Sequence, residues 1–183
     1  MAGVVSTRVG YSGGTTESPT YVNLGDHTEA VEIVFDPSVI TYGDLLDVFF
    51  GAHRPESVPW CDQYRSVVFF SGEDQRVLAE QKKAEIAEEL DLEIHTAIEE
   101  ADTFYQAEDY HQKYQLQRFG ELMSEFQAMY PSFPDFVSST AAARVNGYIP
   151  GNGTLDQLEA EIESLGLSPE GSALLVEYYA RRL

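Results

Sequence analysis

The chain has 183 residues, enough for one globular domain with a small addition, and 43% of them are hydrophobic. Its 31 Asp and Glu outnumber 11 Lys and Arg, for a formal net charge of −20. Such a surface repels nucleic acid and anionic membranes, so we expect neither as a partner. Adaptation to high salt and an ordinary acidic protein are both open explanations of the charge.

No apolar run approaches the roughly 20 residues that span a bilayer. Cys61 is the only cysteine, so an intrachain disulfide is excluded. The first five residues lack the basic and apolar regions of a secretory signal. Together these features favour a cytoplasmic protein.

The first half of the chain alternates predicted strands and helices. The glycine-rich turn at 10–14 follows the first predicted strand, and Thr41 is the expected N-cap of the first predicted helix. In chain order we predict a strand at 4–10, a strand at 30–35, a helix from Thr41, a strand at 67–70 buried on both faces, a helix at 73–90 with Leu90 on its apolar side, and a strand at 93–98.

From residue 107 onward the pattern is helical. Thr154 and Gln157 form a capping-box pattern ahead of apolar residues at steps of three and four. Gly166 is placed to end that helix, and Ser168-Pro169 to begin another. We therefore expect residues 119–183 to form a C-terminal helical hairpin.

The residues alone indicate little catalytic machinery. The chain has no phosphate loop and no Cys-x-x-Cys pair. None of its histidines shows the i, i+4 spacing of a zinc-binding helix. A metal cluster of His27 with Asp26 and Glu29 is conceivable, but a hydrogen-bonded turn is the better interpretation of His27. We expect His111 to be structural as well.

Five short blocks follow one another along residues 4–116: Val-Gly-Tyr-Ser-Gly-Gly at 9–14, Pro-Thr-Tyr at 19–21, Asp-His-Thr-Glu-Ala-Val at 26–31, Gln-Tyr-Arg-Ser at 63–66, and Phe-Tyr-Gln-Ala-Glu-Asp-Tyr-His-Gln-Lys-Tyr at 104–114. In order and spacing they resemble the signature blocks of the type A peptide methionine sulfoxide reductases. The segment at 139–148 resembles an extension found in one subgroup of that family.

The resemblance implies an α+β fold, the ferredoxin-like two-layer sandwich of that family, over residues 1–118, with a C-terminal helical extension over 119–183. In the family, a first strand and helix carrying the motif Gly-Cys-Phe-Trp-Gly precede the segment that resembles residues 4–10. This sequence does not contain that motif. We therefore expect a domain that lacks its first strand and helix.

In that family a Cys thiolate attacks the sulfur of methionine sulfoxide, and a thiol, usually thioredoxin, later restores the enzyme. The resemblance thus implies reduction of free or peptide-bound methionine-S-sulfoxide. The implied partners are oxidised proteins and a thioredoxin-like reductant, with no prosthetic cofactor and no metal. The departing oxygen gains negative charge, so it needs hydrogen-bond donors.

Matching the blocks residue by residue assigns candidate site residues. Tyr11 and Tyr64 take the positions of the two tyrosines that hydrogen-bond the sulfoxide oxygen, and a phenol stays protonated at neutral pH. Asn23 stands at the position of an acidic Glu, and an amide cannot deliver a proton. Asp62 is expected to replace a supporting loop Asp. Cys61 is interpreted as an incidental loop cysteine, because Asp62 and the acidic surface disfavour a thiolate nucleophile.

Two interpretations follow. The chain is an enzyme of this family whose nucleophilic Cys lies outside the sequence, or it is a degenerate relative that binds methionine-containing segments or protein partners without catalysis.

Overall fold

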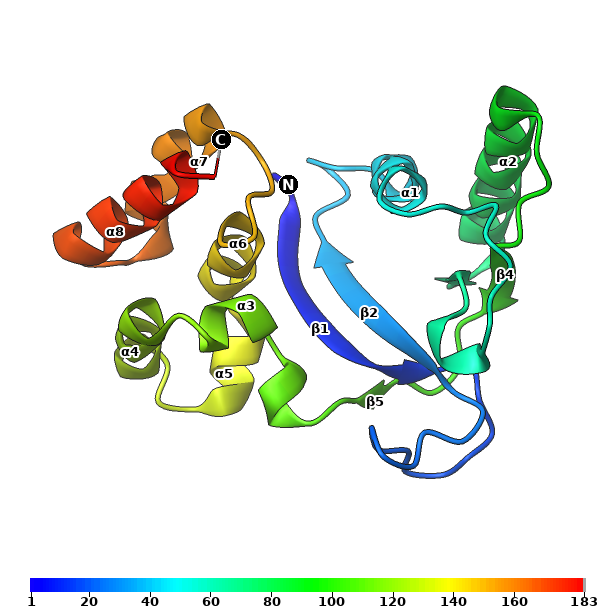
Figure 1. The fold of residues 1–183 in the computed structure, drawn as a ribbon, viewed down its shortest axis with the longest axis horizontal. Coiled ribbons are helices and arrows are strands. Elements are labelled where there is room, and N and C mark those ends of the chain that lie inside the picture. The colour runs from blue at the N-terminus through cyan, green and yellow to red at the C-terminus, as the bar shows by residue number, and fades with distance from the viewer. Residues whose placement is uncertain (183) are drawn as a thin grey trace. The chain divides into compact units, whose positions relative to one another are not determined.

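The computed structural model describes residues 1–182, which mix helices and strands as predicted (Figure 1). They divide into two compact units: unit 1 comprises residues 1–8, 32–36 and 108 onward, and unit 2 comprises residues 9–31 and 37–107. Strands β1 (Val4–Ser12) and β2 (Thr28–Phe35) contribute residues to both units. Within the described range, no helix combines the length and the apolar character needed to cross a bilayer.

The strands form two small sheets. In the first, the order is β2-β1-β5, and β5 (Tyr105–Gln106) runs antiparallel to β1 with Tyr11 opposite Tyr105. In the second, β3 (Val67–Phe70) pairs in parallel with β4 (Ala97–Glu100). Helix α2 (Glu73–Leu90) makes the crossover that a parallel pair requires.

Strand β4 begins at Ala97, four residues after the start we predicted. The preceding residues bond to other partners instead. The amide of His95 donates to the carbonyl oxygen of Pro55 at 2.9 Å, and the ammonium of Lys83 donates to the carbonyl oxygen of Thr96 at 2.6 Å. These contacts attach residues 93–96 to a loop and to α2 before the ladder with β3 starts.

Unit 2 has a small apolar core between α1 (Tyr42–Gly51), α2 and β3. The buried members of this cluster are Leu46, Phe50, Val68, Ala79 and Ile94. Thr41 caps α1 as predicted, through a capping box with Asp44. Two burial predictions are wrong: only Val68 of β3 is fully buried, because its sheet has two strands, and Leu90 is exposed at the last turn of α2.

Unit 1 is built mainly from helices that share a second core. In chain order these are the 3-10 helix η2 (Asp109–His111), α3 (Tyr114–Gln117), α4 (Gly120–Met129), α5 (Phe133–Ser138), α6 (Thr140–Tyr148), α7 (Leu155–Glu161), the 3-10 helix η3 (Ile162–Leu165) and α8 (Pro169–Ala180). The predicted hairpin is therefore too simple. The capping and stop signals predicted within it are confirmed: Thr154 and Gln157 form a capping box, Gly166 is left-handed after η3, and Ser168 caps α8.

A buried lysine lies inside unit 1. The ammonium group of Lys113 donates hydrogen bonds to the carbonyl oxygens of Thr7 and of Val137, the latter at 2.8 Å. Burial lowers the pKa of Lys113 to about 8. The side chain thus holds the start of β1 against the end of α5.

Candidate active site

The turn that follows β1 is organised by Asp26. Its carboxylate accepts hydrogen bonds of 2.8–3.1 Å from the backbone amides and hydroxyls of Thr15 and Thr16. These bonds, led by the Thr15 amide, hold the pKa of Asp26 well below its usual range. The carboxylate therefore stays ionised and keeps the turn closed.

His27 is buried beneath the same turn. The amide of Gly14 donates to its Nδ1 at 3.2 Å, and its Nε2 lies 2.8 Å from the carbonyl oxygen of Thr16. Its ring packs edge-on against Tyr105. A Cβ at Gly14 would lie 2.7 Å from the imidazole, so this approach requires glycine. Both ring nitrogens are engaged, so His27 has the hydrogen-bonded turn role that we expected.

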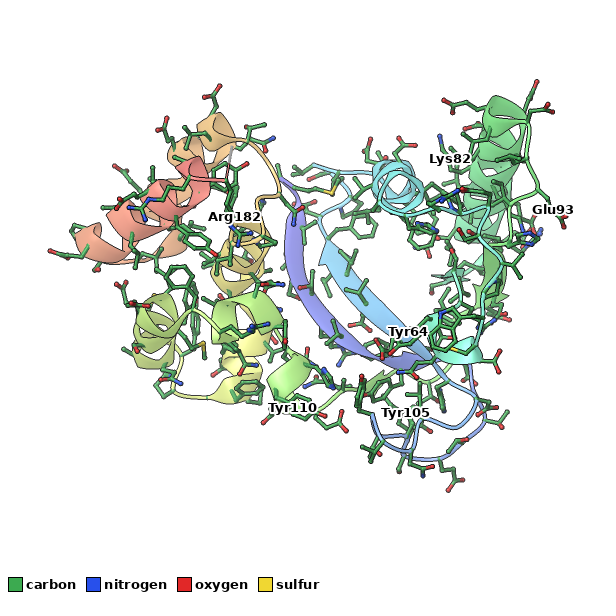
Figure 2. All side chains as sticks on the ribbon, viewed as in Figure 1. Tyr64, Lys82, Glu93, Tyr105, Tyr110 and Arg182 are labelled. Carbon is green, nitrogen blue, oxygen red and sulfur yellow. The ribbon has the colours of Figure 1, made fainter. Side chains whose placement is uncertain are left out.

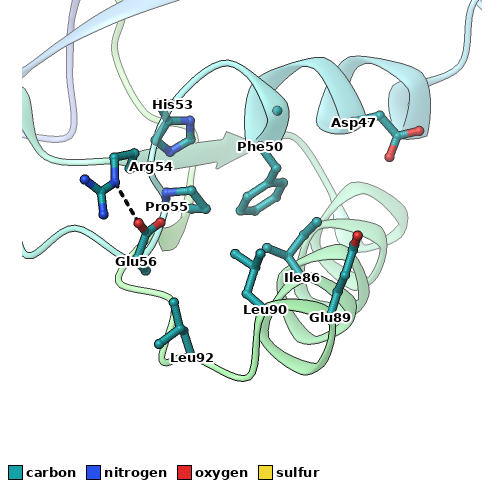
Figure 3. A pocket seen from close by; sticks show the side chains of 11 residues that line it. Asp47, Phe50, His53, Arg54, Pro55, Glu56, Ile86, Glu89, Leu90 and Leu92 are labelled. Atoms are coloured by element: carbon teal, nitrogen blue, oxygen red, sulfur yellow. Dashed lines mark hydrogen bonds and ion pairs between the residues drawn. The ribbon is translucent and has the colours of Figure 1, made fainter.

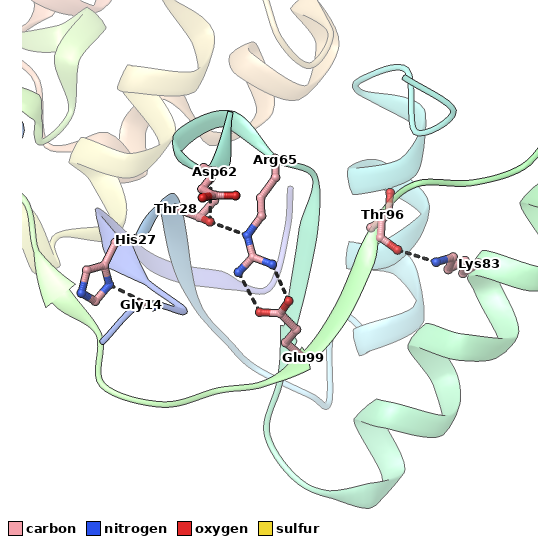
Figure 4. Close-up of polar contacts among 8 residues, drawn as sticks. All are labelled: Gly14, His27, Thr28, Asp62, Arg65, Lys83, Thr96 and Glu99. Carbon is pink, nitrogen blue, oxygen red and sulfur yellow. Dashed lines mark hydrogen bonds and ion pairs between the residues drawn. The ribbon is translucent and has the colours of Figure 1, made fainter. Parts of the chain in front are cut away.

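Two of the signature blocks meet through Thr28 and Arg65 (Figure 4). The hydroxyl of Thr28 donates to the carbonyl oxygen of Asp62 at 2.9 Å and accepts from Nε of Arg65 at 2.7 Å. The other guanidinium nitrogens of Arg65 form a bidentate pair with the carboxylate of Glu99. The 3-10 helix η1 (Asp62–Tyr64) is therefore fixed against β2 and β4.

Tyr64 extends from this fixed turn (Figure 2). The residue is 48% exposed. The amide nitrogen Nε2 of Gln63 donates to the phenol oxygen at 3.0 Å and to Glu29 at 2.7 Å. A hydrogen bond to Tyr21 raises the pKa of Tyr64, with Glu29 adding to the effect. Trp60 packs beside it, with the ring centroids 5.4 Å apart. Tyr64 is thus a protonated donor at neutral pH.

The other candidate residues have different surroundings. Tyr11 is 2% exposed and packs with Leu24 and Ala107. Asn23 is exposed, and its backbone pairs with Thr20 across a tight loop. Asp62 is exposed and contributes its carbonyl oxygen to Thr28.

Cys61 is a free, half-buried thiol. It lies near Tyr64 and adds slightly to the raised pKa of that phenol. Among residues 1–182, no group of three His, Cys, Asp or Glu side chains is arranged to hold a metal ion.

A separate pocket of about 440 Å³ lies at the end of α1 and the last turns of α2 (Figure 3). Its apolar floor includes Phe50, Ile86 and Leu90, and Arg54 pairs with Glu56 at its rim. It contains none of the candidate site residues.

The sequence pattern did not identify the roles of Arg65, Glu99, Gln63 and Trp60. Arg65 and Gln63 stood in a signature block without an assigned role. Glu99 lay beyond the predicted end of its strand. The length of β4 decides whether Glu99 can reach Arg65, and that length is set by the pairing with β3.

We expect Arg65→Ala to destabilise the protein by about 1.5 kcal/mol, because the half-buried carboxylate of Glu99 loses its charge-assisted hydrogen bonds. Urea unfolding measures this change. Arg181→Ala is the matched control, since both side chains of its pair with Glu177 are exposed and its removal should leave the midpoint nearly unchanged. Equal midpoints for both variants would contradict the supporting role of Arg65.

Known proteins match this chain in sequence and in structure. Residues 1–132 match the family model described as peptide methionine sulfoxide reductase. A peptide methionine sulfoxide reductase of Drosophila melanogaster is 41% identical over 169 residues, which cover 91% of this chain and 68% of the relative. One from Methanothermobacter thermautotrophicus is 47% identical over 123 residues, or 61% of this chain and 73% of the relative.

Two solved structures also match this chain. The reduced form of Mxr1 from Saccharomyces cerevisiae matches with a TM-score of 0.59 and 30% identity, covering 65% of this chain and 74% of the other. Methionine sulfoxide reductase A of Corynebacterium diphtheriae matches with a TM-score of 0.54 and 32% identity. That match covers 63% of this chain and 64% of the bacterial protein.

Proposed function

This chain belongs to the peptide methionine sulfoxide reductase family, and from that premise we propose that it is the substrate-binding and oxygen-stabilising part of a methionine-S-sulfoxide reductase. The observation that carries the proposal is Tyr64. Its phenol is partly exposed and protonated and accepts a hydrogen bond from Gln63, and the turn that carries it is bonded to Thr28 through the carbonyl oxygen of Asp62. A rigid neutral donor is what a departing sulfoxide oxygen requires.

The chemistry needs a thiolate, which we propose is supplied by a Gly-Cys-Phe-Trp-Gly segment outside these 183 residues. That thiolate attacks the sulfoxide sulfur, whose oxygen is transferred with protonation to the cysteine. The products are methionine and a cysteine sulfenic acid. A dithiol of the thioredoxin type then reduces the sulfenic acid, becoming a disulfide and releasing water. Because the only cysteine here is Cys61, the proposal includes an external reductant.

In this proposal the strand and helix that carry the nucleophile complete a ferredoxin-like two-layer sandwich over residues 1–118, and residues 119–183 extend it. The parallel β3–α2–β4 crossover and the neighbouring strands β2-β1-β5 support an α+β sandwich. Tyr11 would act with Tyr64 on the oxygen. Asn23 and Asp62 would be auxiliary, and oxidised cytoplasmic proteins would be the substrates.

Turnover assays test this proposal directly. The 183-residue chain, with dithiothreitol as reductant, should not reduce a methionine-S-sulfoxide peptide, because no activated thiolate is present. The same chain preceded by the Gly-Cys-Phe-Trp-Gly strand and helix of a relative should reduce it. Turnover by the 183-residue chain that disappears in Cys61→Ser would overturn the proposal and make Cys61 the nucleophile. An inactive but folded completed chain would favour a non-catalytic binding protein.

A further inference from the structure

Trp60 is unusual for a large aromatic side chain. It is the only tryptophan in the chain, and it is 80% exposed in the loop that precedes η1. Burying an indole is strongly favourable, so leaving one exposed forgoes that stabilisation. Exposed tryptophans are also the side chains that most often dominate binding energies when a ligand covers them. Its exposure therefore leaves an aromatic ring face available to a ligand.

The neighbours of Trp60 limit what that ligand is. Its ring is tilted by 41° to the ring of Tyr64, at a centroid distance of 5.4 Å. The Tyr64 phenol accepts a hydrogen bond from Gln63 and is also hydrogen-bonded to Tyr21. An apolar ring face and a fixed hydroxyl donor thus lie side by side within one short segment.

A methionine sulfoxide side chain combines the two complementary features. Its oxygen is a strong hydrogen-bond acceptor, while its sulfur and methyl group carry the positive end of the S–O dipole. Sulfur and its attached carbons pack favourably on aromatic rings at about 5 Å. The nearby carboxylate of Glu29, which binds Gln63, also favours the positive end of that dipole.

We propose that Trp60 is a substrate-binding residue that packs on the sulfur-bound carbons of methionine sulfoxide in an exposed protein segment while Tyr64 hydrogen-bonds its oxygen. This inference rests on the proposed function and adds a contact residue from the loop before η1. Val58, 72% exposed in the same loop, extends the apolar surface toward residues that flank the oxidised methionine. The net charge of −20 favours neutral or basic flanking residues.

The single tryptophan makes the inference measurable in the 183-residue chain itself. The probe is the peptide acetyl-Lys-Gly-methionine-S-sulfoxide-Gly-amide, titrated to millimolar concentration, with calorimetry in parallel. Covering the indole should shift its emission to the blue, with the same midpoint as the calorimetric curve. The unoxidised methionine peptide should bind more weakly, because it offers no oxygen to Tyr64.

Variants then identify the contact. Trp60→Ala should weaken calorimetric binding at least about fivefold, and Trp60→Phe should recover most of it, since a ring face remains. Val39→Ala is the control, since this exposed side chain lies outside the loop and the proposed site, and its loss should leave binding unchanged. Because Trp60 is largely exposed, its variants should retain the parent unfolding midpoint, which confirms that they are folded.

The outcomes separate this inference from the proposed function. Calorimetric binding with an unchanged Trp60 emission and an unaffected Trp60→Ala variant would overturn the role of Trp60 and leave the proposed function intact. If neither Trp60 fluorescence nor calorimetry detects peptide binding, the inference about Trp60 is also overturned. The turnover assay on the completed chain then decides independently whether the proposed function also fails.

Discussion

Tyr64→Phe, in the chain completed by a Gly-Cys-Phe-Trp-Gly segment, should lower kcat/KM for a methionine-S-sulfoxide peptide by roughly 10²–10³-fold, and Tyr11→Phe by a similar factor. Each change removes one hydroxyl and keeps the ring. The lost hydrogen bond is stronger when the oxygen carries developing charge than in the neutral substrate. The loss should therefore be found mainly in kcat, with a smaller change in KM. Steady-state kinetics with dithiothreitol as reductant measures both constants.

Tyr114→Phe is the control for the tyrosine series, because this exposed phenol accepts a hydrogen bond from Arg118 and has no place in the proposed site. It should turn over substrate at the parent rate. A Tyr11→Phe/Tyr64→Phe double variant that also keeps the parent rate would show that the oxygen site is assigned to the wrong residues. Asn23→Glu should raise kcat if proton delivery limits the reaction, since it introduces an acid where an amide now stands.

Lys113 gives the second large effect, on stability. Burial lowers its pKa to about 8, while in the unfolded chain a lysine titrates near 10.5. Between these values the unfolded state binds more protons than the native state, so stability rises with pH. The cost of burying the charge is present in full below pH 8 and is relieved as pH rises. From pH 7.5 to 9.5 we expect a gain of about 2 kcal/mol from this group.

Urea unfolding at a series of pH values tests this expectation. Lys113→Met should remove most of the rise, whatever its effect at pH 7.5. Lys82→Met is the matched control: its pairs with Glu85 and Asp47 raise the pKa of Lys82, so its linkage lies above this window and the slope should persist. A Lys113→Met protein with the same slope as the parent would show that the buried ammonium is not the source.

Local signals predicted the elements that depend on near neighbours. The bounds of β3 and α2, the N-cap at Thr41 and the capping box at Thr154 were predicted correctly, because capping and periodicity act over a few residues. Burial was harder to predict. Leu90 follows the apolar period of α2 but lies past the end of the small core that α2 covers. The start of β4 was misplaced because distant partners, Pro55 and Lys83, bind the residues before it.

For the candidate site, the sequence predicted which residues of the motif blocks take part, but not the contacts that hold them. The blocks pointed to Tyr11 and Tyr64, and the structure describes the setting of each, one buried and one partly exposed. They did not predict that Arg65 would join Thr28 to Glu99, since that contact depends on the register of β4. The exposure of Trp60 was equally out of reach, because an indole in a proline-containing loop has no periodic signal.

The bonds from Thr28 and Glu29 to the η1 turn also bear on how this region can change over time. Tyr64 takes its position from these cross-links, through the carbonyl of Asp62 and the amide of Gln63. The loop that connects α1 to η1 is therefore not needed to position the Tyr64 phenol. Residues 54–60 can gain or lose length at a modest entropic cost while Tyr64 stays in place. Natural variation in this family should thus concentrate insertions and deletions in that stretch, where they alter which substrate surfaces are reached and leave the oxygen donor undisturbed.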